Sequence, residues 1–345
     1  MELYTTNPLT DNRWDDLVTR HPHSSVFHQR CFLDALNRTY NYEPFVLTTS
    51  PPGMPLRNGA VFCRVSSWIT GKRVVSLPFA DHCDPLLDRG DDFSEFSRWL
   101  RAESERQSWD YVEVRPLWSD MRADRDLHDA GSYCFHRLDM EPTLEQIFSG
   151  LHKDSIQRKI RKAEKERLSY EVGCSEPLVD AFYRLLLKTK LRHRLIPQPR
   201  SWFRNLVACM GHGLQIRLAR KNGEPIAALL TLRHKSTMVF KYGCSDERYH
   251  NLGTMPFLFW KLIEESKNSG IAEIDFGRSD PDNKGLITFK DRFSTARKSL
   301  RYFRYTRVVT TGANAWNSDP MRRIVSALPE AILPTAGRLL YRHIG

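Results

Sequence analysis

The sequence predicts an α+β fold in which one set of elements occurs twice, each copy a mixed, mostly antiparallel sheet flanked by helices. Asn58-Gly59 and Asn222-Gly223 lie between alternating apolar runs, which is a strong hairpin signal. After each hairpin come a third strand, a helix and one more strand. Asn58 and Asn222 are 164 positions apart, and Glu113 and Asp275, in the last strands, are 162 apart. This near-constant separation indicates internal duplication. The alternative is one mixed fold with two coincidental hairpins.

The first copy precedes Pro142. Apolar spacing predicts helices over 14–18, 30–36 and 93–105, and strands over 45–47, 60–65, 74–78 and 111–115. Pro142 disfavours helix at Glu141, so we place the linker at 139–143 and a first domain at residues 1–139.

The second copy gives a domain over residues 140–310. Its predicted strands are 214–220, 226–232, 237–242 and 272–276, with a helix over 256–267. Residues 311–345 form an appendage, because Gly312-Ala313-Asn314 breaks the pattern before a helical stretch over 321–343. That stretch mixes leucines with arginines and contains Pro329 and Pro334. We expect it either to pack on the first domain or to touch a membrane surface.

Composition restricts the class of protein. With 345 residues and 41% hydrophobic content, two packed domains are expected. The 7 cysteines form no Cys-x-x-Cys pair and the 12 histidines show no ligand spacing, so neither disulfides nor a metal site is predicted. No apolar run approaches about 18 residues, and the first residues open no signal peptide. The expected location is cytoplasmic, with peripheral contact at the inner face of the membrane as an option.

The net charge of +11 favours a polyanionic donor or acceptor: tRNA, a nucleotide-linked or lipid-linked sugar, or an anionic membrane face. DNA is not expected. The alternative is a basic protein with no particular anionic partner.

A basic amphipathic helix is predicted over residues 153–165. Ile156, Ile160 and Ala163 fall on one face, while Arg158 and Lys162 project elsewhere. These cations suit phosphate groups of an RNA or a carrier lipid. The alternative is a solvated face with salt bridges to Glu164 and Glu166.

The most informative motif runs from Ile274 to Phe293. A short apolar strand, Ile274-Asp275-Phe276, ends at Gly277, and Arg278 follows in the loop. A short helix then carries Phe289, Lys290 and Phe293. At this strand end Asp275 is suited to orient Lys290 or to accept a proton, and Arg278 to clamp a carboxylate or phosphate. Salt bridges of Asp275 with Arg278 or Lys290 are the structural alternative.

Asp-Phe-Gly-Arg-Ser followed by Gly-Leu-x-x-Phe-Lys-x-x-Phe resembles the second domain of FemABX-type transferases and their CelD-like acetyltransferase relatives. FemAB-like proteins found with bacterial exopolysaccharide and exosortase systems are the closest likeness. The resemblance covers most of residues 1–310 and implies tandem GNAT domains. It also implies that the third strand of the second domain splays from the next strand, and that the wedge between them admits the acyl donor.

The resemblance implies roles for three of these residues. Phe289 would stack on the donor, and Lys290 would neutralise negative charge where an oxyanion develops. Tyr242, in the splayed strand, would exchange a proton with the leaving group. The structural alternatives are a Lys290 that snorkels over Phe289 and Phe293, and a Tyr242 that only packs.

The loop before the helix at 256–267 bears on the donor. A CoA-dependent GNAT enzyme usually has several glycines there, whereas this chain keeps only Gly253, and Pro256 removes an amide from the helix start. FemABX-type proteins resemble this chain in that departure and use aminoacyl-tRNA. We therefore expect no tightly bound cofactor and a donor that is aminoacyl-tRNA or acyl-CoA.

Three functions follow from these observations. The first is acyl or aminoacyl transfer to an amine of a cell-envelope or exopolysaccharide precursor. The second is acyl-CoA-dependent N-acetylation of an amino sugar, and the third is a non-catalytic adaptor that binds a polyanion. No Ser-His-Asp or Cys-His arrangement is legible in the sequence, so direct attack by the amine is favoured over a covalent acyl-enzyme.

Overall fold

The computed structural model describes residues 2–88, 93–119, 121, 124, 127–307 and 333–343. The chain forms two compact units: unit 1 comprises Met1–Tyr133, Leu300–Trp316 and Leu339–Gly345, and unit 2 comprises Cys134–Ser299 and Asn317–Arg338. These limits differ from the expected division at residues 139, 310 and 311. The chain leaves unit 1 in the middle of a long strand, β6 (His128–Asp139), and not in a loop after it. The late strand β12 (Ala296–Thr306) pairs with β5 (Tyr111–Val114), which returns the part of β12 from Leu300 to unit 1.

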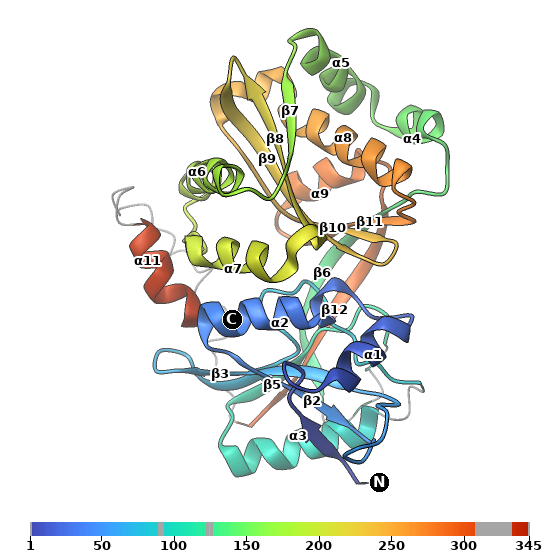
Figure 1. Ribbon diagram of the computed structural model, residues 1–345, viewed down its shortest axis with the longest axis vertical. Coiled ribbons are helices and arrows are strands. Elements are labelled where there is room, and N and C mark those ends of the chain that lie inside the picture. Colours follow the sequence, from blue (N-terminus) through green and yellow to red (C-terminus); the bar gives the residue numbers. More distant parts are fainter. Residues whose placement is uncertain are drawn as a thin grey trace. The chain divides into compact units, whose positions relative to one another are not determined.

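Unit 1 is a mixed sheet in the order β1-β2-β3-β4-β5-β12. In the described ranges the β1–β2, β2–β3, β3–β4 and β5–β12 pairs are antiparallel, whereas β4 and β5 run parallel. Figure 1 shows helices on both faces of this sheet. Its elements before β5 are β1 (Tyr4–Thr6), α1 (Asn12–Arg20), α2 (Arg30–Tyr40), β2 (Glu43–Thr48), β3 (Ala60–Ser67), β4 (Gly71–Val75) and α3 (Phe93–Gln107).

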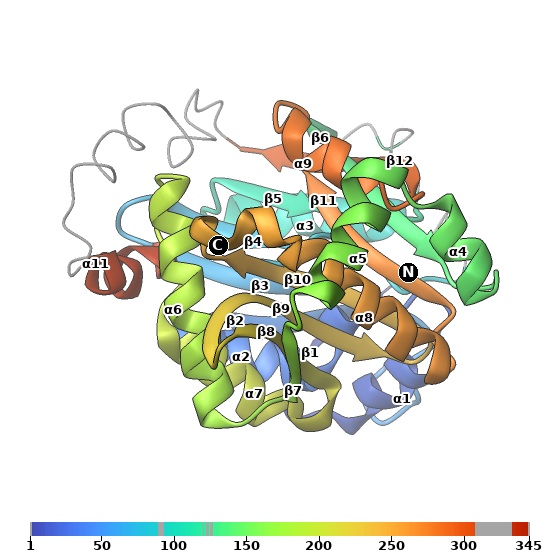
Figure 2. The ribbon, with the colours of Figure 1, turned by 90° about the horizontal axis from the view of Figure 1, so that it is seen from above.

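Unit 2 repeats the plan, with the strand order β7-β8-β9-β10-β11-β6. Here β10 and β11 are the parallel pair. Figures 1 and 2 show α6 and α8 on opposite sides of the central strands. The elements are α4 (Leu144–Gly150), α5 (Arg158–Lys165), β7 (Ser169–Gly173), α6 (Glu176–Arg192), α7 (Arg200–Met210), β8 (Leu214–Lys221), β9 (Glu224–His234), β10 (Thr237–Ser245), α8 (Thr254–Asn268), β11 (Glu273–Ser279) and α9 (Lys284–Asp291).

The two units match strand for strand, so the predicted tandem GNAT fold of class α+β is confirmed. In each, two antiparallel steps lead to a third strand, a helix and a parallel fourth strand. The last parallel pairs are equivalent as well: Val75 lies opposite Glu113 in unit 1, and Val239 opposite Asp275 in unit 2. These are the positions whose constant spacing the sequence displays.

The two Asn-Gly signals have different structures. Asn222 and Gly223 have φ angles of 50° and 80° and join β8 directly to β9, as a two-residue hairpin turn requires. Asn58-Gly59 instead ends a longer loop between β2 and β3. The Asn58 side-chain carbonyl accepts the Thr49 N–H at 3.0 Å and so closes that loop. The hairpin prediction holds for both pairs of strands, but a tight turn forms only in unit 2.

Each unit has its own apolar core. In unit 2, Phe257, Leu258 and Ile263 of α8 pack against the sheet together with Ile160 of α5 and Phe276 of β11. In unit 1, α3 places three apolar side chains on the sheet, namely Phe93, Phe96 and Leu100. Burial of such side chains is the main favourable term for folding, so each unit has what an independent domain needs.

Only part of the predicted appendage, residues 311–345, is described: residues 311–332 and 344–345 lie outside the described ranges. The described part is α11 (Leu333–Leu340) and a 3₁₀ turn, Tyr341–His343. Within unit 1 the Tyr42 hydroxyl donates to the Arg342 carbonyl at 2.8 Å, and His343 is buried. Among the helices of the described ranges, none has the length and apolarity needed to cross a membrane.

Candidate active site

The predicted wedge between β10 and β11 is present in unit 2. The two strands share three parallel pairs, the last of which is Val239 with Asp275. Beyond it, β10 shifts register against β9 between Phe240 and Tyr242, and β11 shifts against β6 between Asp275 and Arg278. Both strands run on past the last pair, to Ser245 and Ser279. The paired irregularities therefore separate the strands where the resemblance places the acyl donor.

Asp275 and Lys290 meet at the irregularity in β11, on opposite sides of Gly277. Gly277 has a φ of 70°, a conformation that favours glycine. Its N–H donates to Asp275 Oδ1, while its carbonyl accepts the Lys290 ammonium at 3.0 Å. The same ammonium donates to the Arg278 carbonyl at 3.1 Å. The sequence motif thus builds a single three-dimensional cluster.

Both charged groups of this cluster are buried. Lys290 is 3% exposed and Asp275 is 2% exposed. A buried ammonium needs hydrogen-bond acceptors to offset the loss of water, and the two carbonyls of β11 serve that purpose. The snorkelling alternative is not what the structure has, because the ammonium turns towards the strand. Arg278 is half-buried, and its carbonyl is the group that contacts Lys290.

An aromatic cluster adjoins this point. The ring centroid of Phe289 lies 5.7 Å from that of Phe259 and 5.2 Å from that of Phe293. Phe276 of β11 stacks on Phe259 at 5.1 Å with an interplanar angle of 9°. Phe289 is half-buried whereas Phe293 is fully buried. Phe289 is therefore at the edge of the cluster, as a residue that contacts a donor must be.

His136, on β6, was missed by the sequence analysis. It is fully buried and pairs with Asp291 of α9, with 3.1 Å between Nε2 and Oδ1. Because a carboxylate only accepts, the proton is on Nε2 and Nδ1 carries a lone pair. Nδ1 is buried without a hydrogen-bond partner. Burial, helped by the Lys290 charge, lowers the pKa of His136. A lone histidine in an amphipathic strand gives no sequence signal for this.

Tyr242 contacts side chains of α7. Its hydroxyl accepts the Trp202 indole N–H of α7 at 3.0 Å, and its ring meets Phe203 edge-on at 5.3 Å. Phe240, across the β10 irregularity, instead packs on Phe259 of α8. Tyr242 therefore lines the α7 side of β10, whereas Lys290 and Asp275 belong to β11 and α9.

Basic side chains surround the end of β10. The Ser245 carbonyl oxygen lies 3.5 Å from an Arg192 guanidinium nitrogen. The Ser245 hydroxyl lies 2.9 Å from His250 Nε2. The Asp246 carboxylate forms ion pairs with Arg248 and Lys188. These two cations hold the pKa of Asp246 far below the usual range. The exit of the strand is therefore rich in hydrogen-bond donors.

The predicted basic helix forms as one π-helical turn, Lys153–Gln157, followed by α5. Ile156, Ile160 and Ala163 are buried, as predicted, and Arg158 and Lys162 are exposed. Arg158 has only a loose ion pair, 3.5 Å from Asp154, with 77% of its side chain exposed. The alternative bridges to Glu166 do not form in this helix, because Glu166 binds Lys221 at 2.8 Å.

Gly253 explains how α5 meets the start of α8. Its φ is 76°, and a Cβ there would overlap the carbonyl oxygen of Lys159 on α5. Gly253 is thus needed for close packing of two backbones. Pro256 occupies the third position of α8 and supplies no amide. The α8 N-terminus is therefore covered by α5 and short of one donor, unlike an open phosphate-binding helix start.

In unit 1 the equivalent wedge is filled. Ser76 N–H extends the β4–β5 pairing by donating to the Glu113 carbonyl at 2.8 Å. The Glu113 carboxylate, 5% exposed, is clamped by Arg115 at 2.7 Å and by Arg304 of β12. Arg115 also donates to the Leu77 carbonyl at 3.0 Å. Glu113, the residue equivalent to Asp275, is thus part of a buried ion-pair network.

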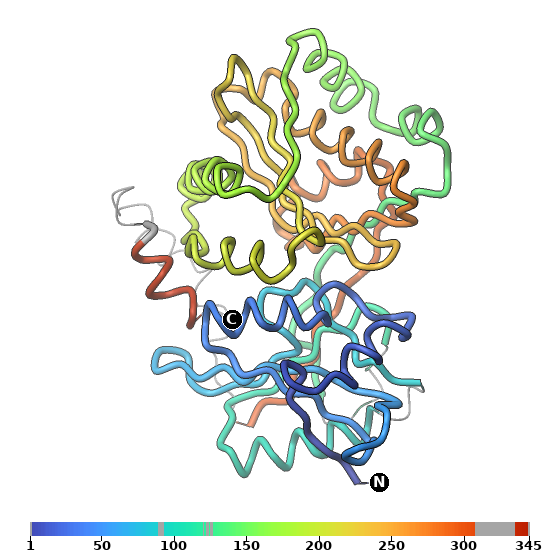
Figure 3. The backbone as a smooth tube through the Cα atoms, viewed as in Figure 1, coloured from blue at the N-terminus to red at the C-terminus, as the bar shows by residue number. Residues whose placement is uncertain are grey.

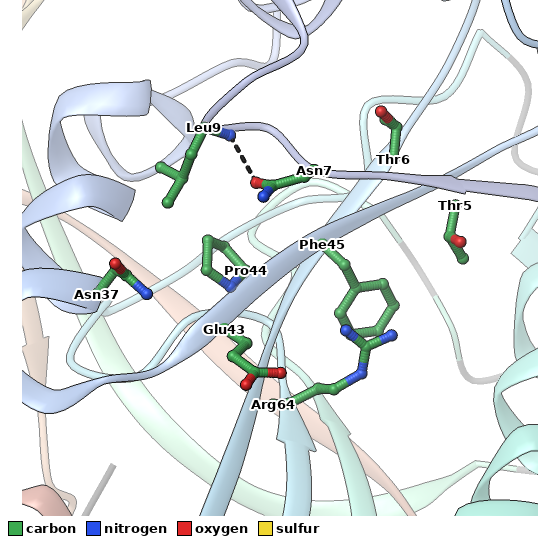
Figure 4. Close-up of a pocket in the computed structure, with 9 residues that line it drawn as sticks. All are labelled: Thr5, Thr6, Asn7, Leu9, Asn37, Glu43, Pro44, Phe45 and Arg64. Carbon is green, nitrogen blue, oxygen red and sulfur yellow. Dashed lines mark hydrogen bonds between the residues drawn. The ribbon is translucent and has the colours of Figure 1, made fainter.

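Two surface hollows lie away from the predicted residues. One, of about 410 Å³, belongs to unit 1, where the Arg64 guanidinium lies 4.1 Å above the Phe45 ring (Figure 4). The other, of about 580 Å³, belongs to unit 2 and is lined by the end of β6, the loop before α4, α4 itself and Ser294. Neither is lined by Lys290, Asp275 or Tyr242. In the described ranges no three His, Cys, Asp or Glu side chains gather as metal ligands do.

Comparison with known proteins agrees with this geometry. Residues 151–290 match the family model described as an acetyltransferase (GNAT) domain. These residues include the wedge, α5 and Lys290. The match covers the central part of unit 2, so this region is similar to a GNAT acetyltransferase domain, in agreement with the acyltransferase that the sequence predicts. A search of curated proteins found no match.

Three solved structures share the fold. FemX superposes with a TM-score of 0.70 at 12% identity, covering 89% of this chain and 97% of its own. L-PGS from Bacillus licheniformis gives 0.56 at 13%, covering 91% and 95%. A tandem GNAT protein from the clavulanic acid biosynthesis pathway gives 0.57 at 11%, covering 90% and 100%. These likenesses extend the tandem fold over nearly the whole chain.

Proposed function

We propose that unit 2 transfers an acyl or aminoacyl group from a polyanionic donor to an amine of a cell-envelope or exopolysaccharide precursor. The observation that carries this proposal is the separation of β10 and β11 beside the buried Asp275–Gly277–Lys290 cluster. The same position in unit 1 is filled by Glu113 and two arginines. Transfer therefore belongs to unit 2.

The chemistry needs a base, an acid and charge stabilisation. The acceptor nitrogen attacks the donor carbonyl and forms the C–N bond, and the C–O or C–S bond to the carrier then breaks. The Lys290 charge, held by two carbonyls, favours the oxyanion in the transition state. Asp275 is committed to the Gly277 N–H, so His136 Nδ1 is the better acceptor for the amine proton. Tyr242 is the remaining candidate to protonate the leaving group.

The covered start of α8 favours aminoacyl-tRNA as donor. Acyl-CoA is normally held through its pyrophosphate on open helix amides. Here Gly253 is packed under Lys159, and Pro256 lacks its amide. The neighbouring helix α5, which packs against α8, exposes the cationic side chains of Arg158 and Lys162 to solvent. A long polyanion suits separate exposed cations better than a compact pyrophosphate does.

Acyl-CoA-dependent acetylation of an amino sugar is the second candidate. It is favoured by the match of residues 151–290 to a domain described as an acetyltransferase. A purely adaptor role is disfavoured, because the buried charges gather at the wedge and not on a remote surface.

Mass spectrometry of ligands that remain bound after native purification separates the candidates: tRNA, CoA or neither. The assay that follows supplies aminoacyl-tRNA or acetyl-CoA to the protein with an amine acceptor and measures transferred label. Label from aminoacyl-tRNA alone supports the first candidate, and label from acetyl-CoA alone overturns it in favour of the second. No transfer from either donor, together with retained tRNA, favours the adaptor.

A further inference from the structure

An exposed apolar tip lies at the turn between β3 and β4 of unit 1. Trp68 is 86% exposed and Ile69 is 39% exposed. Tryptophan is strongly buried on average, so this exposure calls for an explanation. The turn is also well fixed, because the Ser67 hydroxyl oxygen accepts the N–H groups of Ile69 at 3.1 Å and Thr70 at 2.9 Å. The fold therefore holds two large apolar side chains in water.

The C-terminal turn braces this tip. The Ser67 hydroxyl lies 2.9 Å from His343 Nδ1. The Thr70 hydroxyl and the buried Arg73 guanidinium both donate to the His343 carbonyl at 2.9 Å. The Trp68 ring meets the His343 ring edge-on at 5.5 Å. Figure 3 shows the light-blue β3–β4 turn close to the red C-terminal segment.

This bracing adds residues 339–343 to the same surface. Leu339 is 59% exposed, and the Arg342 side chain is exposed. Lys72, just after the turn, is exposed too. Residues 64–73 and 339–343 include no aspartate or glutamate. Asp110, which approaches the turn, accepts the Lys72 backbone N–H at 2.9 Å. The exposed charged side chains of these two segments, Lys72 and Arg342, are thus both cationic.

We propose that this surface, defined by Trp68, Ile69, Lys72, Leu339 and Arg342, docks on an anionic lipid bilayer. Tryptophan prefers the membrane interface, where its ring is apolar on one side and meets polar headgroups on the other. Lysine and arginine beside it gain energy from an anionic leaflet. The proposal concerns location, so it does not rest on the proposed transfer reaction.

The size of the surface favours a bilayer over a protein partner. Stable protein interfaces bury about 1,200 Å² or more in total. Two exposed apolar side chains on the turn and one on α11 provide far less than that. A bilayer has no such minimum, because its binding strength scales with whatever apolar area enters and with the charge nearby. The surface shares Leu339 and Arg342 with the predicted 321–343 contact, but it centres on the β3–β4 turn, which lies outside that segment.

The test is flotation of the full-length protein with vesicles. Vesicles of phosphatidylcholine alone are compared with vesicles that also contain phosphatidylglycerol. We expect flotation with the anionic vesicles, and binding weaker by about tenfold or more in Trp68→Ala/Ile69→Ala. Trp118→Ala is the matched control, because Trp118 is a 42% exposed tryptophan of the same unit that lies outside the β3–β4 turn, with its ring beside that of His23. It should float as the wild type does.

Reversing the charges of Lys72 and Arg342 tests whether electrostatic attraction to the anionic lipid contributes to binding. Lys72→Glu/Arg342→Glu should weaken binding to anionic vesicles by about fivefold for each cation removed, and more at low salt than at high salt. The proposal is overturned if the wild type does not float, or if Trp68→Ala/Ile69→Ala floats as well as Trp118→Ala. It is also overturned if the tip variant only turns a dimer into a monomer in sedimentation velocity, which would make the surface a contact between two copies.

Discussion

Lys290 is the residue on which the transfer proposal depends most. Its ammonium donates hydrogen bonds to the Gly277 and Arg278 carbonyls at the irregular end of β11. Removing this side chain therefore changes both the stability of unit 2 and the charge at the site. We expect Lys290→Met to lower kcat/KM by about 100-fold through loss of oxyanion stabilisation. It should also destabilise unit 2 by about 1–3 kcal/mol, because two buried carbonyls lose a partner.

The matched control for Lys290 is Lys284→Met, at the exposed start of the same helix. It should leave both kcat/KM and the melting temperature unchanged. If Lys290→Met lowers the melting temperature while kcat/KM of the folded fraction stays at the wild-type value, Lys290 is structural only.

His136 gives the proposed reaction a pH dependence. Its pKa is lowered by burial and by the Lys290 charge, so the neutral imidazole persists below the usual range near 6.5. If Nδ1 accepts the amine proton, kcat should fall as pH falls through that lowered pKa. The measurement is a kcat profile of the wild type against His136→Gln, which should be slower and lack this limb. A wild-type kcat that does not fall at any pH between 7 and the pH at which the protein unfolds would contradict the assignment.

At the scale of elements, the surface of α5 is the clearest case for polyanion binding. Arg158→Glu/Lys162→Glu should abolish a tRNA shift in a low-salt gel, because phosphate contacts dominate such binding. The control is Arg98→Glu/Arg106→Glu on α3 of unit 1, which changes the net charge equally at two exposed positions. If both variants lose the shift, net charge is responsible; if neither does, α5 does not contact the RNA.

The sequence predicts elements well where a local rule decides them. The apolar stripe of α5 and the Asn222-Gly223 turn follow from spacing and from backbone preference, and both are present. Asn58-Gly59 obeys the same local rule but closes a loop, because Gly59 pairs with Leu86, far along the chain. The wedge was expected only through the resemblance, since its two irregularities arise from pairing with β9 and β6.

Across the whole molecule, the duplication can be predicted from the sequence. The sequence does not predict that the late strand β12 completes the order of unit 1 while the earlier strand β6 completes that of unit 2. Spacing locates equivalent strands, whereas the pairing of β12 with β5 joins residues about 190 positions apart. His136 illustrates the same limit for the site. It becomes a candidate only when β6 and α9 bring it to Asp291, a residue 155 positions later.

Acid stability is a property of the whole molecule to which one buried group, His28, should contribute strongly. His28 is fully buried, and burial lowers its pKa to about 4. Its Nδ1 accepts the Ser25 N–H at 3.0 Å, and Nε2 lies 2.8 Å from the Asp84 carbonyl, an arrangement for the neutral ring. The unfolded chain takes up this proton near pH 6.5, so stability is full above that value and falls as pH drops towards 4. Between pH 7 and pH 5 the loss from His28 is about 2 kcal/mol.

Urea unfolding at pH 7, 6 and 5 measures that slope, and paired carboxylates contribute little in this window because they titrate lower. His28→Gln should be less stable than the wild type at pH 7, since it disturbs a buried hydrogen-bonded site. Its stability should nevertheless fall less between pH 7 and pH 5, by about the same 2 kcal/mol. Parallel slopes for the two proteins would show that His28 is not the group whose protonation limits the fold in acid.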